Sequence, residues 1–178
     1  MFGFNQSTFL VNRPQDPLYN LTFEEWWFHG HLNLPPHPDD IMQLPVGGKA
    51  MTQLSCDKGA TSWYASAPGG DTRDPNDPDY PCPHAPLKEF HTTGIKDLGG
   101  CALSVAYKSD ANEVQPEDLV IFSVNHTCVW NLHTYFEIPK DMPPCPNGKC
   151  ICAWHWIHTP DSGAEQSWFH CLISVAFD

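Results

Sequence analysis

Histidine is the residue type in this chain with the clearest capacity for chemistry. There are ten, at His29, His31, His37, His84, His91, His126, His133, His155, His158 and His170. Neutral imidazole nitrogens suit Cu(II) or zinc at a protein surface. His29 and His31 lie two residues apart, which on a strand would place both on one face; there we favour buried, hydrogen-bonded side chains beside tryptophans over metal ligands. His91 precedes the turn residues Thr92 to Gly94, and spacing alone does not distinguish it.

Eight cysteines and three Asn-x-Ser/Thr sites form a second set of residues with predictable chemistry. The sites are Asn5, Asn20 and Asn125, each a candidate for N-glycosylation. An even number of cysteines in such a chain predicts four disulfides. Together the two signals indicate the secretory route and an oxidising, extracellular compartment.

One cysteine pair follows from local geometry. Cys145 and Cys150 enclose the short turn Pro146 to Lys149, which brings their Cα atoms within bridging range. Cys150 and Cys152 would instead point to opposite faces of an extended segment. A zinc site built on Cys-x4-Cys-x-Cys is disfavoured, because a secreted chain oxidises such thiols and the spacing is not that of a structural zinc site.

Composition limits the partners and the compartment. The 178 residues suit a single domain, and 9 Lys+Arg against 21 Asp+Glu give a net charge of −12, which argues against nucleic acid or an anionic membrane as partner. A neutral ligand fits better. Secretion requires a signal peptide, and the segment Met1 to Asn5 has neither a basic nor an apolar region. We therefore expect a few residues to be missing upstream of Met1.

The candidate residues must be positioned by a fold rich in strands and loops, since 18 Pro and 12 Gly disfavour a helical bundle. Pro68 to Asp79 reads as a long surface loop, and Leu21 to Phe28 as one or two helical turns capped by Thr22 with Glu25 three residues later. The sequence predicts an all-β fold, an immunoglobulin-like or fibronectin-like antiparallel β-sandwich with long loops and short helical turns. Its predicted strands are Ala50 to Leu54, Ala102 to Lys108, Leu119 to Val124, Thr134 to Ile138, Cys150 to Ile157 and Trp168 to Ala176.

Several motifs occur in a familiar order along the chain. They are Pro17-Leu18-Tyr19, Trp26-Trp27-Phe28-His29-Gly30, Leu119-Val120-Ile121-Phe122-Ser123-Val124, Asp141-Met142-Pro143-Pro144-Cys145-Pro146 and Cys150-Ile151-Cys152-Ala153-Trp154. With these motifs the chain, from about Met1 to Cys171, resembles the fungal lytic polysaccharide monooxygenases of auxiliary activity family fourteen. The resemblance implies a secreted copper enzyme that cleaves xylan-coated cellulose oxidatively. Its partners would be the polysaccharide and an external electron donor, with no nucleic acid and no membrane.

The resemblance also implies a complete disulfide pattern. The implied pairs are Cys56 with Cys82, Cys101 with Cys128, Cys145 with Cys150, and Cys152 with Cys171.

In such enzymes one type 2 copper is held by a histidine brace, formed by the amino group and ring of an N-terminal histidine and the ring of a second histidine. The second histidine matches His91, whereas the first has no match in this sequence. The family's axial tyrosine would fall within Ala164 to Phe169, which contains no tyrosine, so Glu165 or Phe169 takes its place. Gln166 is a candidate for steering a copper-bound ligand by a hydrogen bond, although an ordinary surface amide is the simpler interpretation.

Aromatic side chains near the copper would stack on sugar rings. Trp63 and Tyr64 are candidates, although core positions are the simpler interpretation for both. Two functions from different classes therefore stand. One is a copper-dependent polysaccharide monooxygenase whose first residues are missing here; the other is a non-catalytic secreted relative, binding carbohydrate or copper or serving a structural role, that has lost the brace.

Overall fold

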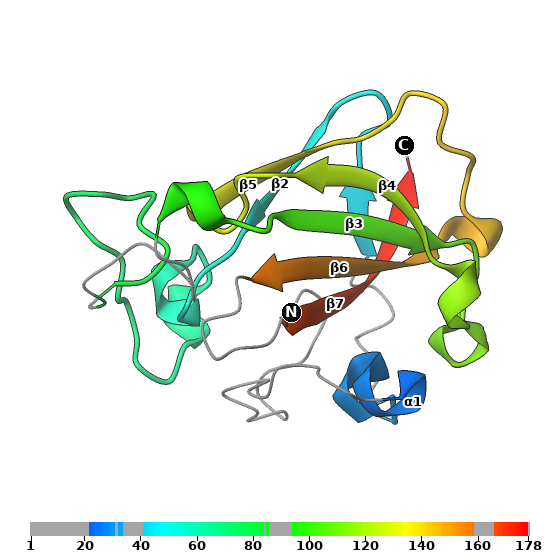
Figure 1. Cartoon of the computed structure of the whole chain (residues 1–178), viewed down its shortest axis with the longest axis horizontal. Coiled ribbons are helices and arrows are strands. Elements are labelled where there is room, and N and C mark those ends of the chain that lie inside the picture. The colour runs from blue at the N-terminus through cyan, green and yellow to red at the C-terminus, as the bar shows by residue number, and fades with distance from the viewer. Residues whose placement is uncertain are drawn as a thin grey trace.

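The computed structural model describes residues 22–30, 32–33, 41–83, 85, 94–158 and 166–177, with the backbone alone for most of the last range. Two sheets dominate this part of the chain (Figure 1). The larger has the strand order β1-β7-β6-β3-β4, and the smaller pairs β2 with β5. The strands are β1 (Ile41–Leu44), β2 (Lys49–Gln53), β3 (Cys101–Ala106), β4 (Val120–Asn125), β5 (His133–Glu137), β6 (Cys150–His158) and β7 (Gln166–Phe177).

The all-β fold with mainly antiparallel strands is confirmed, and all six predicted strands are present. The sequence did not predict β1, which has four residues and alternates too briefly to stand out. This strand pairs with β7 in parallel, with Ile41 opposite Ser174, whereas the other pairings are antiparallel. The immunoglobulin-like topology remains a prediction.

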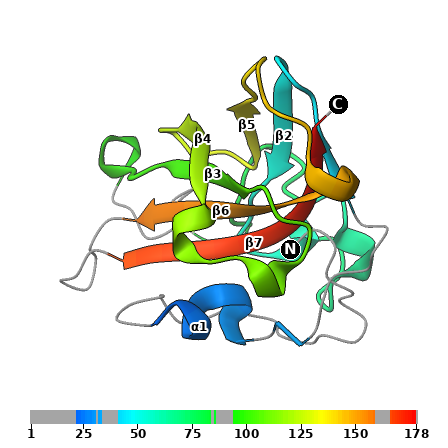
Figure 2. The same ribbon diagram turned by 90° about the vertical axis from the view of Figure 1, so that its right-hand side faces the viewer.

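The larger sheet buries residues on both faces, because other elements cover both (Figure 2). On one face Leu103 and Val105 of β3 pack with Phe136 of the smaller sheet. On the other, Ala106 and Ile151 pack against the helical turns that begin at Phe23. Central strands covered on both faces are expected to be almost continuously apolar, and five of the six β3 residues are indeed fully buried.

The predicted helical turns are confirmed as α1 (Phe23–Trp26) and the 3₁₀ turn η1 (Trp27–Gly30). The backbone N–H of Thr22 donates to the Glu25 carboxylate at 2.7 Å, which lowers the pKa of that group. His29 lies in η1 and not on a strand, so the spacing argument for His29 and His31 does not apply. The side chains of His29 and His31 lie outside the described residues.

Short 3₁₀ turns and one long loop connect the strands. As predicted, Pro68 to Asp79 contains no regular structure; Asp74 and Asp77 stabilise it by accepting backbone N–H groups two residues further on. The remaining turns are η2 (Lys58–Ala60), η3 (Tyr64–Ser66), η4 (Ile95–Asp97), η5 (Ala111–Glu113), η6 (Pro116–Asp118) and η7 (Pro146–Gly148).

Three disulfides link these elements. They are Cys56–Cys82, Cys101–Cys128 and Cys145–Cys150, with Cα–Cα distances of 4.9, 5.5 and 5.2 Å, and they are pairs that the family resemblance implies. Cys152 is buried, and the Cys171 side chain lies outside the described residues, so their pairing remains a prediction.

Candidate functional site

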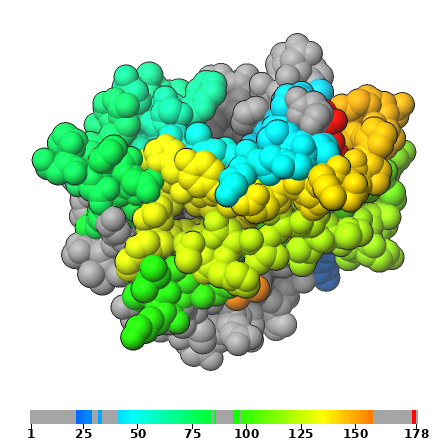
Figure 3. Space-filling model, turned by 90° about the horizontal axis from the view of Figure 1, so that it is seen from above, coloured from blue at the N-terminus to red at the C-terminus, as the bar shows by residue number. Residues whose placement is uncertain are grey.

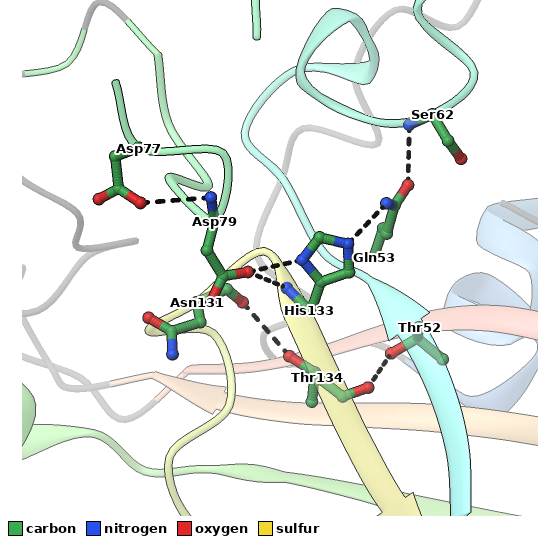
Figure 4. Close-up of polar contacts among 8 residues, drawn as sticks. All are labelled: Thr52, Gln53, Ser62, Asp77, Asp79, Asn131, His133 and Thr134. Carbon is green, nitrogen blue, oxygen red and sulfur yellow. Dashed lines mark hydrogen bonds and ion pairs between the residues drawn. The ribbon is translucent and has the colours of Figure 1, made fainter. Parts of the chain in front are cut away.

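A chain of hydrogen bonds crosses one end of the smaller sheet (Figure 4). His133, the first residue of β5, places its ring Nδ1 2.7 Å from Oδ1 of Asp79, and its backbone N–H donates to the same oxygen at 2.8 Å. Its Nε2 lies 3.0 Å from Nε2 of Gln53, the last residue of β2. The side-chain oxygen Oε1 of Gln53 accepts the backbone N–H of Ser62 at 2.8 Å. We call Asp79, His133, Gln53 and Ser62 the polar chain.

The polar chain fixes the tautomer of the imidazole. Because the Gln53 side-chain oxygen faces Ser62, its NH₂ group must face His133, so Nε2 accepts and Nδ1 carries the proton donated to Asp79. Both ring nitrogens are therefore occupied. His133 positions loops and is not available as a metal ligand in this arrangement.

A hollow of about 350 Å³ lies beside the polar chain. Figure 3 views this face of the molecule, where β4, β5 and β2 run next to one another beside the loops before and after Cys56. Hydroxyl, amide and phenol groups and one carboxylate dominate the wall. The lining residues are Asp79, Asn125, Thr127, Asn131, His133, Thr134 and Tyr135. No local sequence pattern predicts this hollow or the polar chain, because their residues come from distant segments.

Trp63 and Tyr64 lie on the turn that Ser62 begins. The Trp63 side chain is 68% exposed, so the interpretation of this residue as core is wrong. Tyr64 is half-buried, and the Arg73 guanidinium lies 3.9 Å from the centre of its ring, held there by two hydrogen bonds to the Asp71 carboxylate. One face of Tyr64 is thus covered, and Trp63 presents the more accessible ring.

His155 of β6 is a second histidine with a defined partner. Its Nε2 lies 2.6 Å from the Ser104 hydroxyl of β3, and burial lowers the pKa of the imidazole to about 4. The ring is therefore neutral at neutral pH. Among the residues that the structure describes, no group of three or more His, Cys, Asp or Glu side chains could hold a metal ion.

The side chains of the four residues predicted for the copper site lie outside the described part of the structure. His91 and Glu165 lie outside the described residues; Gln166 and Phe169 lie on β7, opposite His158 and His155, with their side chains undescribed.

The backbone nevertheless shows where the predicted site segments run. The Ile157 N–H donates to the Gly100 carbonyl at 3.1 Å, so the segment that follows His91 runs along the end of β6. This brings Gly100, the end of β6 and the start of β7 together. Within the described ranges, no helix is long and apolar enough to span a membrane.

The two sheets, the disulfides and the polar loops define a disulfide-linked β-sheet domain with an exposed aromatic side chain. Residues 1–176 match the family model for lytic polysaccharide monooxygenase AA14, so the chain belongs to this family, as the sequence motifs indicated.

Relatives with the same family name support the assignment. The AA14 family lytic polysaccharide monooxygenase B of Pycnoporus cinnabarinus is 53% identical over 180 residues, covering 98% of this chain and 47% of the relative. Enzyme A of Trametes coccinea is also 53% identical, over 98% of this chain and 41% of its own length. Enzyme B of Talaromyces rugulosus is 21% identical over 86% of this chain and 57% of the relative. The chain thus spans about half the length of the relatives it matches.

Proposed function

We propose that this chain forms the catalytic domain of a secreted, copper-dependent polysaccharide monooxygenase. The observation that carries the proposal is the family match over residues 1–176, which includes His91 and the segment Ala164 to Phe169. Copper, when bound, supplies the redox chemistry of oxidative cleavage. The protein contributes the ligands, the surface on which the polysaccharide lies, and the hydrogen bonds that orient both.

The proposed ligands of the single type 2 copper are His91 and an amino-terminal histidine from outside these 178 residues. Glu165 or Phe169 would lie near the copper in place of the family's tyrosine, and Gln166 would act by hydrogen bonding. Two of the described histidines support the choice of His91 indirectly, because their rings already have partners. His133 uses both ring nitrogens within the polar chain, and His155 is buried against Ser104.

The proposed substrate is xylan-coated cellulose, with an external electron donor. Trp63 supports a carbohydrate surface, because an exposed tryptophan supplies a large flat face for sugar rings. The net charge of −12 also favours a neutral polymer over a polyanion.

A non-catalytic secreted relative that binds carbohydrate or copper is the second candidate. It is favoured by the segment Ala164 to Phe169, which lacks the family's axial tyrosine. We further propose N-glycosylation at Asn125, Asn5 and Asn20 in the secretory route.

Copper binding by two forms of the protein tests the proposal. We expect a form with an amino-terminal histidine to bind one Cu(II) tightly by calorimetry and to give a type 2 paramagnetic resonance spectrum. The form that begins at Met1 should bind at least about a hundredfold more weakly, because it lacks the chelate of an amine and a ring on one residue.

In the longer form, H91A should abolish tight binding, and H126A is the matched control, since His126 is exposed. Equal, tight binding by both lengths would overturn the brace. Tight copper binding without oxidised oligosaccharide products from xylan-coated cellulose would favour the non-catalytic candidate.

A further inference from the structure

The hollow beside the polar chain carries hydrogen-bonding groups that the protein itself does not use. In the described part of the chain, Asp79 receives both of its side-chain hydrogen bonds on Oδ1, which leaves Oδ2 uncommitted. The side-chain amide of Asn131 and the hydroxyl of Tyr135 make no hydrogen bond within the described residues. A carboxylate oxygen, an amide and a phenol therefore face solvent around one hollow.

The walls of the hollow are held in place. The Asn125 side-chain oxygen accepts the backbone N–H groups of Thr127 and Cys128, each at 2.9 Å, and the Thr127 hydroxyl at 3.1 Å. The Asn125 Nδ2 donates to the Tyr135 carbonyl at 2.9 Å, which joins β4 to β5. Since Asp79 is fixed by His133, a ligand would meet a carboxylate that is already oriented, which lowers the entropic cost of binding.

The lining chemistry selects a class of ligand. Among the described residues that line the hollow there is no lysine or arginine and there is one carboxylate, which disfavours anions. Its volume of about 350 Å³ lies within the range of about 300 to 1,000 Å³ typical of small-molecule sites. Tyr135 is 54% exposed, and its ring and hydroxyl add an apolar face and a polar tip. The hydroxyl groups of a sugar ring can hydrogen-bond to the amide and the carboxylate. Its C–H faces can pack on the phenol ring.

We propose that this hollow, whose lining residues include none of the proposed copper-site residues, binds a single neutral sugar ring. One source of such a ring is a free oligosaccharide. The other is a glycan on Asn125, because this residue lies in an Asn-x-Thr sequence and forms part of the wall. A glycosylated Nδ2 keeps one N–H, so the hydrogen bond to the Tyr135 carbonyl is compatible with the modification. The proposal stands or falls independently of copper.

The test compares the secreted protein with protein made in a bacterial periplasm, which forms disulfides without adding glycans. Mass spectrometry gives the occupancy of Asn125 in the first. Both are titrated with N-acetylglucosamine and with xylotriose while NMR follows the Asn131 side-chain amide and the Tyr135 ring.

We expect saturable shifts of these two signals in the unglycosylated protein. Binding should weaken at least fivefold in N131A and in Y135F. M51A should not change it, because Met51 is similarly exposed and lies opposite Tyr135 on β2 without lining the hollow.

The two sources give different results. If the Asn125 glycan fills the hollow, the glycosylated protein will not respond to added sugar and the unglycosylated protein will. If free oligosaccharide is the ligand, both forms will respond. The proposal is overturned if the unglycosylated protein shows no saturable shift at Asn131 and Tyr135, or if N131A and Y135F bind as tightly as the parent.

Discussion

The largely buried imidazole of His155 makes the fold sensitive to acid. Burial lowers its pKa from an ordinary value of 6.5 to about 4. Below pH 6.5 the unfolded chain takes up a proton that the folded chain excludes, so stability falls as the pH is lowered from 6.5 to about 4. Below that pH both states are protonated and the loss levels off. Over this range the free energy of unfolding should fall by about 3 kcal/mol. Urea unfolding at each pH measures it.

H155Q should remove most of this dependence, whereas H126Q, at an exposed position, should keep it. The pH window separates the effect from that of the carboxylates. The pKa of Asp118 is lowered chiefly by a hydrogen bond from Lys108, so its contribution is lost only as the pH falls through its ordinary value of 3.8 and below. If the free energy of unfolding of H155Q falls as steeply between pH 6.5 and 4 as that of the parent, another group is responsible.

Trp63 and Tyr64 provide a matched pair of neighbouring rings. Because Trp63 is exposed and one face of Tyr64 is covered by Arg73, W63A should weaken adsorption to xylan-coated cellulose about three- to tenfold, and Y64A should weaken it less. Pull-down isotherms measure both. A stronger effect of Y64A than of W63A would place the sugar surface elsewhere on this turn.

At the scale of residues, the sequence predicted what depends on neighbours in the chain. Thr22 and Glu25 lie three residues apart, and Cys145 and Cys150 lie five residues apart, so short-range rules apply to both pairs. The contacts of His133 span 54 residues to Asp79 and 80 to Gln53. No local pattern encodes such a contact, because the fold alone brings its partners together.

At the scale of elements, the polar chain connects the turn bearing Trp63 to the end of the smaller sheet. Q53A should free the Ser62 N–H and leave the His133 ring without its donor, with a cost of about 1 kcal/mol in unfolding free energy. Amide exchange should speed up at Ser62 and Trp63. T52V, which removes a 3.3 Å hydrogen bond between the same two strands, should leave exchange in this turn unchanged. Equal exchange in Q53A and the parent would contradict the link.

The disulfides differ in the length of chain they close. Cys101–Cys128 closes 27 residues between the start of β3 and the turn after β4, whereas Cys145–Cys150 closes 5. Replacing both cysteines of the first pair by alanine should cost about 2 to 5 kcal/mol, and the same change in the second pair less, because a longer loop gains more entropy when released. Denaturant midpoints give the ranking, and the reverse order would contradict this argument.

Element positions were predicted well where the segment itself carries the pattern. Five of the six residues of β3 are apolar, four of the nine residues of β6 are Ile or Trp, and both strands formed where expected. Strand β1 was missed because its identity depends on a partner more than a hundred residues away. The order of strands within the sheet is likewise set by tertiary packing.

The whole molecule is organised around a sheet with covered faces and two edges. One edge is β4, where Val120, Ile121 and Val124 are 60%, 60% and 52% exposed. The fold class followed from composition and from short strands separated by turn residues. The placement of the helical turns on one face and of the smaller sheet on the other did not, because both placements depend on which apolar faces meet.

Strand β7 occupies an interior position of the larger sheet although it is among the last segments in the sequence. During synthesis β1 and β6 therefore emerge before β7, the strand that pairs with both of them. Closure of the larger sheet has to await β7, so this sheet is complete only after residues up to Phe177 have left the ribosome or translocon. Until then β1 and β6 present unpaired backbone, and chaperone binding in that interval is the expected safeguard against edge-to-edge association.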